Sequence, residues 1–315
     1  MRGGWVTLSP IIIKNISRWN ILLFIMISGY LFLPRDISIA IMWKKYIRRI
    51  AICFAVWSLL YTAYNAVINI HQQMPLVMVC KNIVGDFFNG GTRRMWYLVM
   101  LLALYAFIPL ISRWVRHSTK QEHLYALILT GLLAILLPSL QMIHPFETVF
   151  GLDIERIQGV YSSVYVFYLL FGYLFLDYLS KDEMTRGQAA LYIAGGLVSA
   201  IIMAVIAKYQ GEVSPIGLVF YMPVTACLVV IAQRSDGFLY SHKCGAILRN
   251  ISDCSFGIYL IHTAVQYAFL HLGAEHYFLR MPPVTGILCY FAALFCVSWV
   301  LAIILRKSKV GRSIT

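Results

Sequence analysis

The stretch Pro283–Leu305, with the sequence PVTGILCYFAALFCVSWVLAIIL, contains no charged side chain. Crossing the hydrocarbon core of a bilayer, roughly 30 Å thick, takes about 20 mostly apolar helical residues. The stretch therefore predicts a transmembrane helix. Earlier in the 315-residue chain, other apolar stretches are long or nearly long enough to cross as well: Ile16–Leu33, Ile47–Ile70, Met95–Val115, Leu124–Ile143, Val160–Leu179, Ala189–Ala207, Pro215–Ala232 and Phe256–Leu272.

The composition agrees with a membrane protein. Hydrophobic residues make up 60% of the chain and charged residues 12%, against about 25% charged in a typical soluble domain. We predict an all-α, polytopic integral membrane bundle of about nine transmembrane helices, with an external segment 1–15, a transmembrane domain 16–305 and a cytoplasmic basic tail 306–315. The longest loops, Gln72–Arg94 and His144–Gly159, have room for short interfacial helices.

The net charge of +13 is distributed in a way that argues against nucleic-acid binding. With nine spans, most Lys and Arg residues fall in the loops on one side, for example in residues 35–49 and 306–312. Short cytoplasmic loops are enriched in Lys and Arg, so this side is predicted to be cytoplasmic, with the C-terminus inside and residue 1 outside. The seven cysteines show no CxxC motif, and neither a zinc site nor a disulfide framework is expected.

One group of polar residues lies inside a predicted span, where polar side chains are costly. Ser255, Tyr259 and His262 are spaced i, i+4, i+7 and share one helical face. This stripe is consistent with a polar cavity lining. Taken on the residues alone, it is more typical of hydrogen bonds to a neighbouring helix.

A second group is basic. Lys45, Arg48 and Arg49 project from one helical face at the cytoplasmic start of the second span. Such a cluster suits the phosphates of a nucleotide-based cofactor. The alternative is a positive anchor beside anionic lipid.

Two further motifs have both a functional and a packing interpretation. Trp96 and Tyr97 stand at the outer end of a span, where they can form an aromatic belt or stack on a sugar. Ser28 and Gly29 lie within the first span, where Gly29 permits close helix approach and Ser28 can bond within its own helix.

These motifs together resemble the acyltransferase 3 family, which comprises membrane-bound bacterial O-acyltransferases. The resemblance covers nearly the whole chain, and within the family it is greatest to the enterobacterial common antigen O-acetyltransferase type, because a Ser17-Arg18 pair precedes the Ser-Gly-Tyr helix. The motifs occur in the family's order: Phe24–Phe32 with Ser28-Gly29-Tyr30, the basic cluster, Trp96-Tyr97-Leu98 with Tyr105 and Pro109, and Ser255–His262.

The resemblance implies ten helices in the bacterial inner membrane, with both termini cytoplasmic. It also implies that acetyl-CoA is a co-substrate from the cytoplasm, that no cofactor is permanently bound, and that the acceptor is a sugar of a lipid-linked or surface glycan. The basic cluster Lys45, Arg48 and Arg49 would contact the CoA phosphates. The substrate-contacting residues implied are Arg18, Ser28, Trp96, Tyr97, Ser255 and Tyr259.

The chain departs from the family pattern at its start. The family's first helix carries a histidine regarded as the catalytic base, and residues 1–15 here correspond to the loop after that helix. His262 is then the remaining candidate base, and we expect this polypeptide by itself to be inactive. Arg94 also stands where relatives often have histidine. The alternative interpretation is a non-enzymatic glycan or lipid exporter, or an accessory membrane protein.

Overall fold

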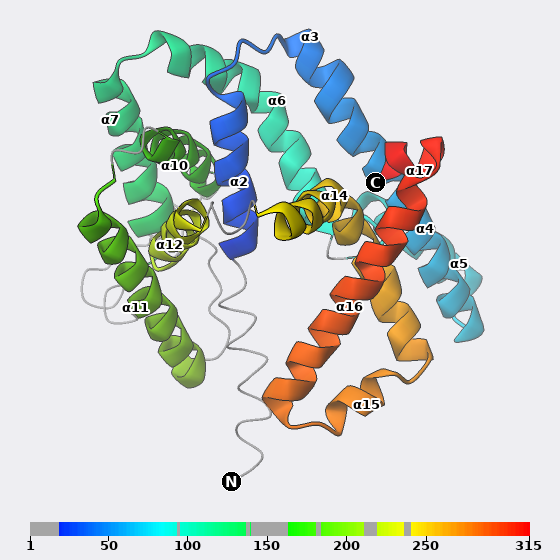
Figure 1. Ribbon diagram of the computed structural model, residues 1–315. Helices are drawn as coiled ribbons and strands as arrows, with labels where there is room; N and C mark the ends of the chain where they lie inside the picture. Colours follow the sequence, from blue (N-terminus) through cyan, green and yellow to red (C-terminus); the bar gives the residue numbers. More distant parts are fainter. Residues whose placement is uncertain are drawn as a thin grey trace, which may run out of the picture. The chain divides into compact units, whose positions relative to one another are not determined.

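The computed structural model describes residues 19–92, 95–136, 139, 163–180, 184–210, 219–235 and 241–315, and every regular element in them is a helix (Figure 1). The chain divides into two compact units. The first contains the chain up to Ile37 together with Leu110–Tyr240, and the second contains Ser38–Pro109 and Ser241–Thr315. Helix α6 contributes residues to both.

The first unit is built from α2 (Trp19–Phe32), α7 (Lys120–Gly131) with the π-helical turn η3 (Leu132–Leu136), α10 (Ser163–Ser180), α11 (Arg186–Gln210) and α12 (Tyr221–Arg234). The second unit contains α3 (Ile39–Ile41), the π-helical turn η1 (Met42–Ile47), α4 (Arg48–His71), α5 (Leu76–Phe88), α14 (His242–His271), α15 (Glu275–Leu279), α16 (Pro283–Arg306) and α17 (Lys309–Ile314). Helix α6 spans Trp96–His117.

The helices confirm the class predicted from hydropathy. Four are long and apolar enough to cross a membrane, and three shorter apolar helices accompany them. The long ones are Ile39–His71, Trp96–His117, Arg186–Ile206 and Pro283–Arg306, and the shorter ones are Trp19–Phe32, Val164–Leu179 and Tyr221–Arg234. The chain is thus a polytopic membrane protein, and the total of nine crossings stays a prediction.

Two details refine the predicted organisation. Helix α14 begins at His242, well before the predicted span starts at Phe256. The polar turns before Phe256 and the apolar turns after it belong to one continuous α-helix. The predicted loop Gln72–Arg94 contains the short helix α5, as expected, whereas the loop His144–Gly159 lies outside the described residues.

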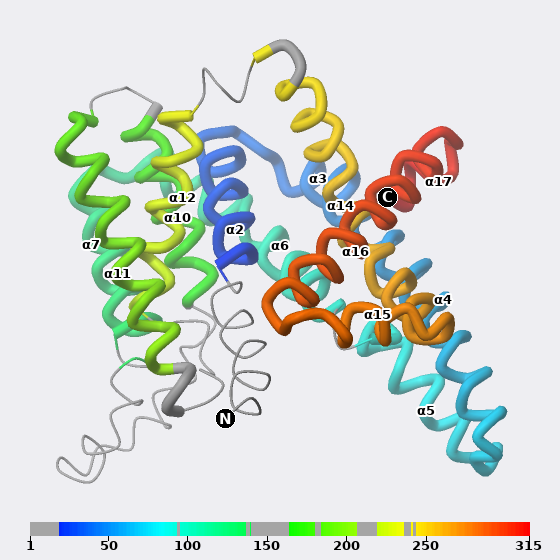
Figure 2. The backbone as a smooth tube through the Cα atoms, turned by 60° about the horizontal axis from the view of Figure 1, so that its bottom comes forward, coloured from blue at the N-terminus to red at the C-terminus, as the bar shows by residue number. Residues whose placement is uncertain are grey.

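In the first unit, α2 lies against α10 (Figures 1 and 2). Glycines bring the two backbones into contact: a Cβ atom at Gly29 would collide with the carbonyl oxygen of Leu169, and one at Gly172 would collide with the backbone of Met26. Small residues at helix contacts are how membrane helices gain close packing. The packing role predicted for Gly29 is therefore confirmed.

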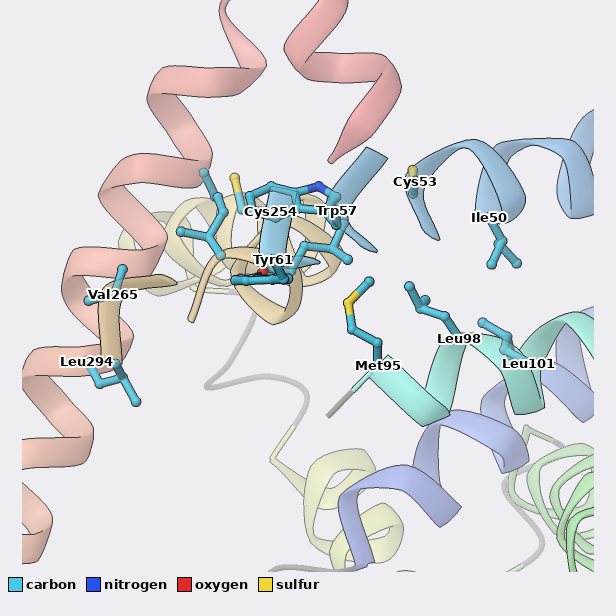
Figure 3. Close-up of a cluster of buried hydrophobic side chains, with 13 residues drawn as sticks. Ile50, Cys53, Trp57, Tyr61, Met95, Leu98, Leu101, Cys254, Val265 and Leu294 are labelled. Carbon is cyan, nitrogen blue, oxygen red and sulfur yellow. Dashed lines mark hydrogen bonds between the residues drawn. The ribbon is translucent and has the colours of Figure 1, made fainter. Parts of the chain in front are cut away.

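The second unit has its own core, in which α4, α6, α14 and α16 surround Trp57, Tyr61 and Leu98 (Figure 3). The segment after α16 folds back as α17 and packs on α4. There Trp57 Nε1 donates a hydrogen bond of 2.9 Å to the carbonyl oxygen of Ile314, and Thr315 is fully buried. Residues 309–314 of the predicted basic tail thus form a helix packed against the unit.

We expect valine at Gly29 or at Gly172 to separate α2 from α10. Overpacking a tight contact typically costs about 1–3 kcal/mol, so each variant should unfold at a lower temperature than the parent. Gly195→Val is the matched control, since nothing lies within 4 Å of the Cβ position at this glycine of α11. Thermal unfolding of the purified protein in detergent measures the effect. Equal stability of the three variants would contradict this account of the helix contact.

Candidate functional site

The candidate site depends on how α14 is held against α4. The Tyr61 hydroxyl of α4 donates to the carbonyl oxygen of Leu260 at 2.7 Å and accepts from the amide nitrogen of Ala264 at 3.1 Å. Leu260 and Ala264 are an i, i+4 pair of α14, so their carbonyl oxygen and amide nitrogen are partners in the helix. The buried Tyr61 hydroxyl bonds to both of these groups at once. The contact fixes the turn of α14 that carries His262.

His262 is half-buried, and its imidazole is tied to its own helix. Nδ1 lies 2.5 Å from the carbonyl oxygen of Tyr259, and Nε2 lies 3.4 Å from Thr263 Oγ1. Because a carbonyl only accepts hydrogen bonds, Nδ1 carries a proton in this contact, so the lone pair of the neutral form of the ring would be on Nε2. This is the tautomer that a general base presenting Nε2 requires.

An aromatic chain connects His262 to the start of α6. The ring centroids are 6.5 Å apart for Trp96 and Tyr97, 5.6 Å for Tyr97 and Tyr259, and 5.8 Å for Tyr259 and His262. Residues more than 150 positions apart in sequence thus become neighbours in one unit. Of the predicted site residues, these four are brought together.

A cavity of about 970 Å³ lies beside this group within the second unit. Its volume falls in the usual range for small-molecule sites. The lining combines carboxylates, amides and hydroxyls with aromatic rings. It consists of Asn65, Asp86, Asn89, Gly91, Thr92, Trp96, Thr263, Gln266, Tyr267, Leu270 and Glu275.

One amide organises the wall of the cavity between α4 and α5. Asn65 Nδ2 donates to Asp86 Oδ2 at 3.0 Å and to the carbonyl oxygen of Gly91 at 2.8 Å. The turn after α5 needs glycine, since Gly90 and Gly91 have φ values of +83° and +67° and a side chain at Gly91 would collide with Tyr61 and Ser58. The chain thereby passes close to α4 before α6 begins.

The sequence did not single out Asn65 and Asp86, which form this wall, or Tyr61, which holds α14 against α4. Asn65 lies inside the predicted span Ile47–Ile70, and polar residues at membrane depth are functional candidates, so this signal was present in the sequence. Asp86 and Tyr61 gave no comparable signal. An acid in a predicted loop and a tyrosine in a span rich in aromatic residues are both commonplace.

The basic cluster lies at the other end of α4. Lys45, Arg48 and Arg49 are exposed, and Lys45 Nζ lies 5.4 Å from the ring centroid of Tyr46. Among the residues that the structure describes, no carboxylate forms an ion pair with any of the three. From Arg48 to Tyr61 the rise along the helix is about 20 Å at 1.5 Å per residue.

The remaining predicted site residues are placed elsewhere. Ser28 belongs to the first unit, where its hydroxyl donates to the Phe24 carbonyl oxygen at 2.9 Å within α2. Ser255 donates to the Ser252 carbonyl oxygen at 2.8 Å within α14, about two turns before His262. Both serines bond within their own helices, as helical serines often do. Arg18 lies outside the described residues.

The fold and site define an integral membrane protein in which one helical unit carries an exposed basic helix end, an imidazole with a defined tautomer and a polar, aromatic-lined cavity. The chain matches the model of the acyltransferase 3 family, described as an acyltransferase domain, over residues 2–303. It therefore belongs to the acyltransferase 3 family, whose members use an acyl donor and an acceptor. No curated protein and no solved structure shows significant similarity to it.

We expect Tyr61→Phe to loosen the contact between α4 and α14, because it removes both hydrogen bonds to the α14 backbone. Interhelical hydrogen bonds in membranes contribute about 0.6–2 kcal/mol, so thermal unfolding in detergent should occur at a lower temperature. The control is Tyr64→Phe. Tyr64 lies one turn after Tyr61 on α4, and its exposed hydroxyl bonds to His271 at the end of α14. If the control destabilised the protein as much as Tyr61→Phe, the bridging role of Tyr61 would be wrong.

Proposed function

We propose that this protein is an O-acetyltransferase of the bacterial inner membrane that moves an acetyl group from cytoplasmic acetyl-CoA to a sugar hydroxyl of a lipid-linked or surface glycan. Family membership supports acyl transfer. The observation that carries the finer proposal is the gathering of Trp96, Tyr97, Tyr259 and His262 beside a polar cavity, in the same unit as the basic cluster.

The basic cluster suits the donor. The CoA phosphates would bind Lys45, Arg48 and Arg49, whose cationic groups are exposed and form no ion pair within the described part of the chain. The thioester would then have to reach the level of Tyr61 and His262, about 20 Å along α4. An extended donor anchored by its nucleotide end fits this separation.

The sequence alone leads us to expect a chain without its catalytic base, but the geometry of His262 suits the chemical step, and we propose that His262 takes this role. In the proposed reaction Nε2 takes the proton of the acceptor hydroxyl while the hydroxyl oxygen forms a bond to the thioester carbonyl carbon. The resulting oxyanion needs hydrogen-bond donors, and the neighbouring hydroxyls of Tyr97 and Tyr259 are suited to this task. Collapse of the intermediate breaks the carbon–sulfur bond, and the CoA thiolate recovers the proton from the imidazolium.

We expect His262→Gln to lower the rate of acetyl transfer by about 10²–10⁴-fold, the usual contribution of a general base. Membranes containing the protein would be supplied with radiolabelled acetyl-CoA, and label in lipid-linked glycan would be measured. The control is His271→Gln on the same helix. If the parent protein bound CoA but transferred nothing, His262 would not be the base, and the expectation that this polypeptide lacks its base would gain support.

We expect joint replacement of Arg48 and Arg49 by alanine to weaken CoA binding at least tenfold, because two charge-assisted contacts to phosphate are lost. Binding would be measured by calorimetry on protein purified in detergent. Joint replacement of Arg306 and Lys307, at the end of α16, removes the same charge and is the matched control. Unchanged CoA affinity, with a loss only of correct membrane orientation, would favour an anchor for anionic lipid and weaken the enzyme proposal.

A further inference from the structure

The wall of the cavity contains the carboxylate of Asp86, which can accept more hydrogen bonds than its contact with Asn65 uses. Asp86 is half-buried, lines the cavity and engages Asn65 through Oδ2. A carboxylate offers about four acceptor positions, and the Asn65 amide uses one of them. Both amide hydrogens of Asn65 are committed, to Asp86 and to Gly91, so the amide fixes the position of Oδ2 beside the cavity.

A hydroxyl oxygen in the lining of the same cavity has no hydrogen-bond partner in the described part of the chain. Thr92 Oγ1 is inaccessible to solvent and has no hydrogen-bond partner within the described part of the chain. Buried hydroxyls are rarely left unpaired, because an unmade hydrogen bond costs about 1–3 kcal/mol. Thr92 also lines the cavity, so rotation of its side chain toward the cavity would let a ligand hydroxyl supply the missing partner.

Two aromatic rings complete the lining. Tyr267 is stacked on Tyr64, with centroids 4.7 Å apart and an interplanar angle of 15°, so its ring has a fixed orientation. Trp96 lines the cavity from the start of α6 and remains 38% exposed. Rigid aromatic faces beside hydroxyl-binding groups suit a ligand that has both apolar ring faces and hydroxyl edges.

We propose that this cavity is the acceptor site and that Asp86, oriented by Asn65, is an acceptor-positioning residue. In this arrangement Asp86 accepts a hydrogen bond from one sugar hydroxyl, Thr92 bonds to another, and Trp96 and Tyr267 contact the ring. Thr263 lines the cavity next to His262, so a sugar held there lies near the imidazole. The inference rests on the proposed transfer to a sugar and adds the residues that select and hold the acceptor.

The kinetic experiment compares Asp86→Asn with the parent protein, using radiolabelled acetyl-CoA and titrated lipid-linked glycan extracted from the source cells. Asparagine keeps an oxygen that can accept from Asn65, so the fold should persist. Loss of a charged acceptor should raise the KM for glycan about 10–100-fold. We expect kcat and the KM for acetyl-CoA to stay within about twofold. Asp253→Asn, an exposed carboxylate on α14, is the matched control.

A binding experiment decides the inference even if the protein transfers nothing. Native mass spectrometry would count glycan-lipid adducts on the parent, Asp86→Asn and Thr92→Val proteins. Removing an unsatisfied hydroxyl should leave thermal stability equal or higher, whereas removing a ligand contact lowers glycan occupancy. We therefore expect Thr92→Val to bind less glycan while unfolding at no lower temperature.

Three results would overturn the inference: no glycan adduct on the parent protein, unchanged binding in both variants, or an Asp86→Asn protein that loses stability and CoA binding together with glycan binding. The last pattern would make Asp86 a structural brace. Failure of the proposed function is a separate result, namely glycan binding that depends on Asp86 without any acetyl transfer.

Discussion

The site depends on one buried hydroxyl. In a bilayer every backbone polar group must be satisfied within the protein, so a helix offers few places where a side chain from a neighbour can bond to it. Tyr61 uses such a place, at Leu260 and Ala264, and thereby fixes the height and rotation of α14 relative to α4. This contact helps to set the position of His262 and the contact of Tyr259 with Tyr97, since both residues lie in the turns of α14 next to Leu260.

Helix α4 separates two chemical environments. Its first turn is cationic and exposed, and its later turns carry Tyr61 and Asn65, which bond to α14 and to the chain after α5. A rigid helix keeps these two ends at a constant distance, which the proposed binding of the donor at one end and reaction at the other would require. The same helix also receives α17 through Trp57, so it is the common support of the second unit.

Much of this arrangement could be predicted from the sequence. Hydropathy located apolar helices from Trp19 to Arg306, since the length and apolarity that a bilayer demands are local properties. The spacing of Tyr259 and His262 placed them one turn apart for the same reason. The Asp86–Asn65 pair and the tautomer of His262 could not be predicted, because they depend on which groups of distant segments meet. The two-unit division is likewise set by long-range contacts.

Polar side chains complete backbone hydrogen bonds in both units, and in the second unit they also line a cavity. In the described part of the first unit, α2 and α10 meet through glycine, and Ser112 and Gln233 donate to backbone carbonyl oxygens at helix ends. Such groups complete the backbone hydrogen bonds that a bilayer leaves unmet. The second unit has such contacts too, at Trp57, Tyr61 and Asn65, and carboxylates, amides and hydroxyls also surround a cavity there. Among them Asn65 lies in a helix long and apolar enough to cross a membrane, where a polar side chain is costly unless it has partners, and it bonds to Asp86 and Gly91.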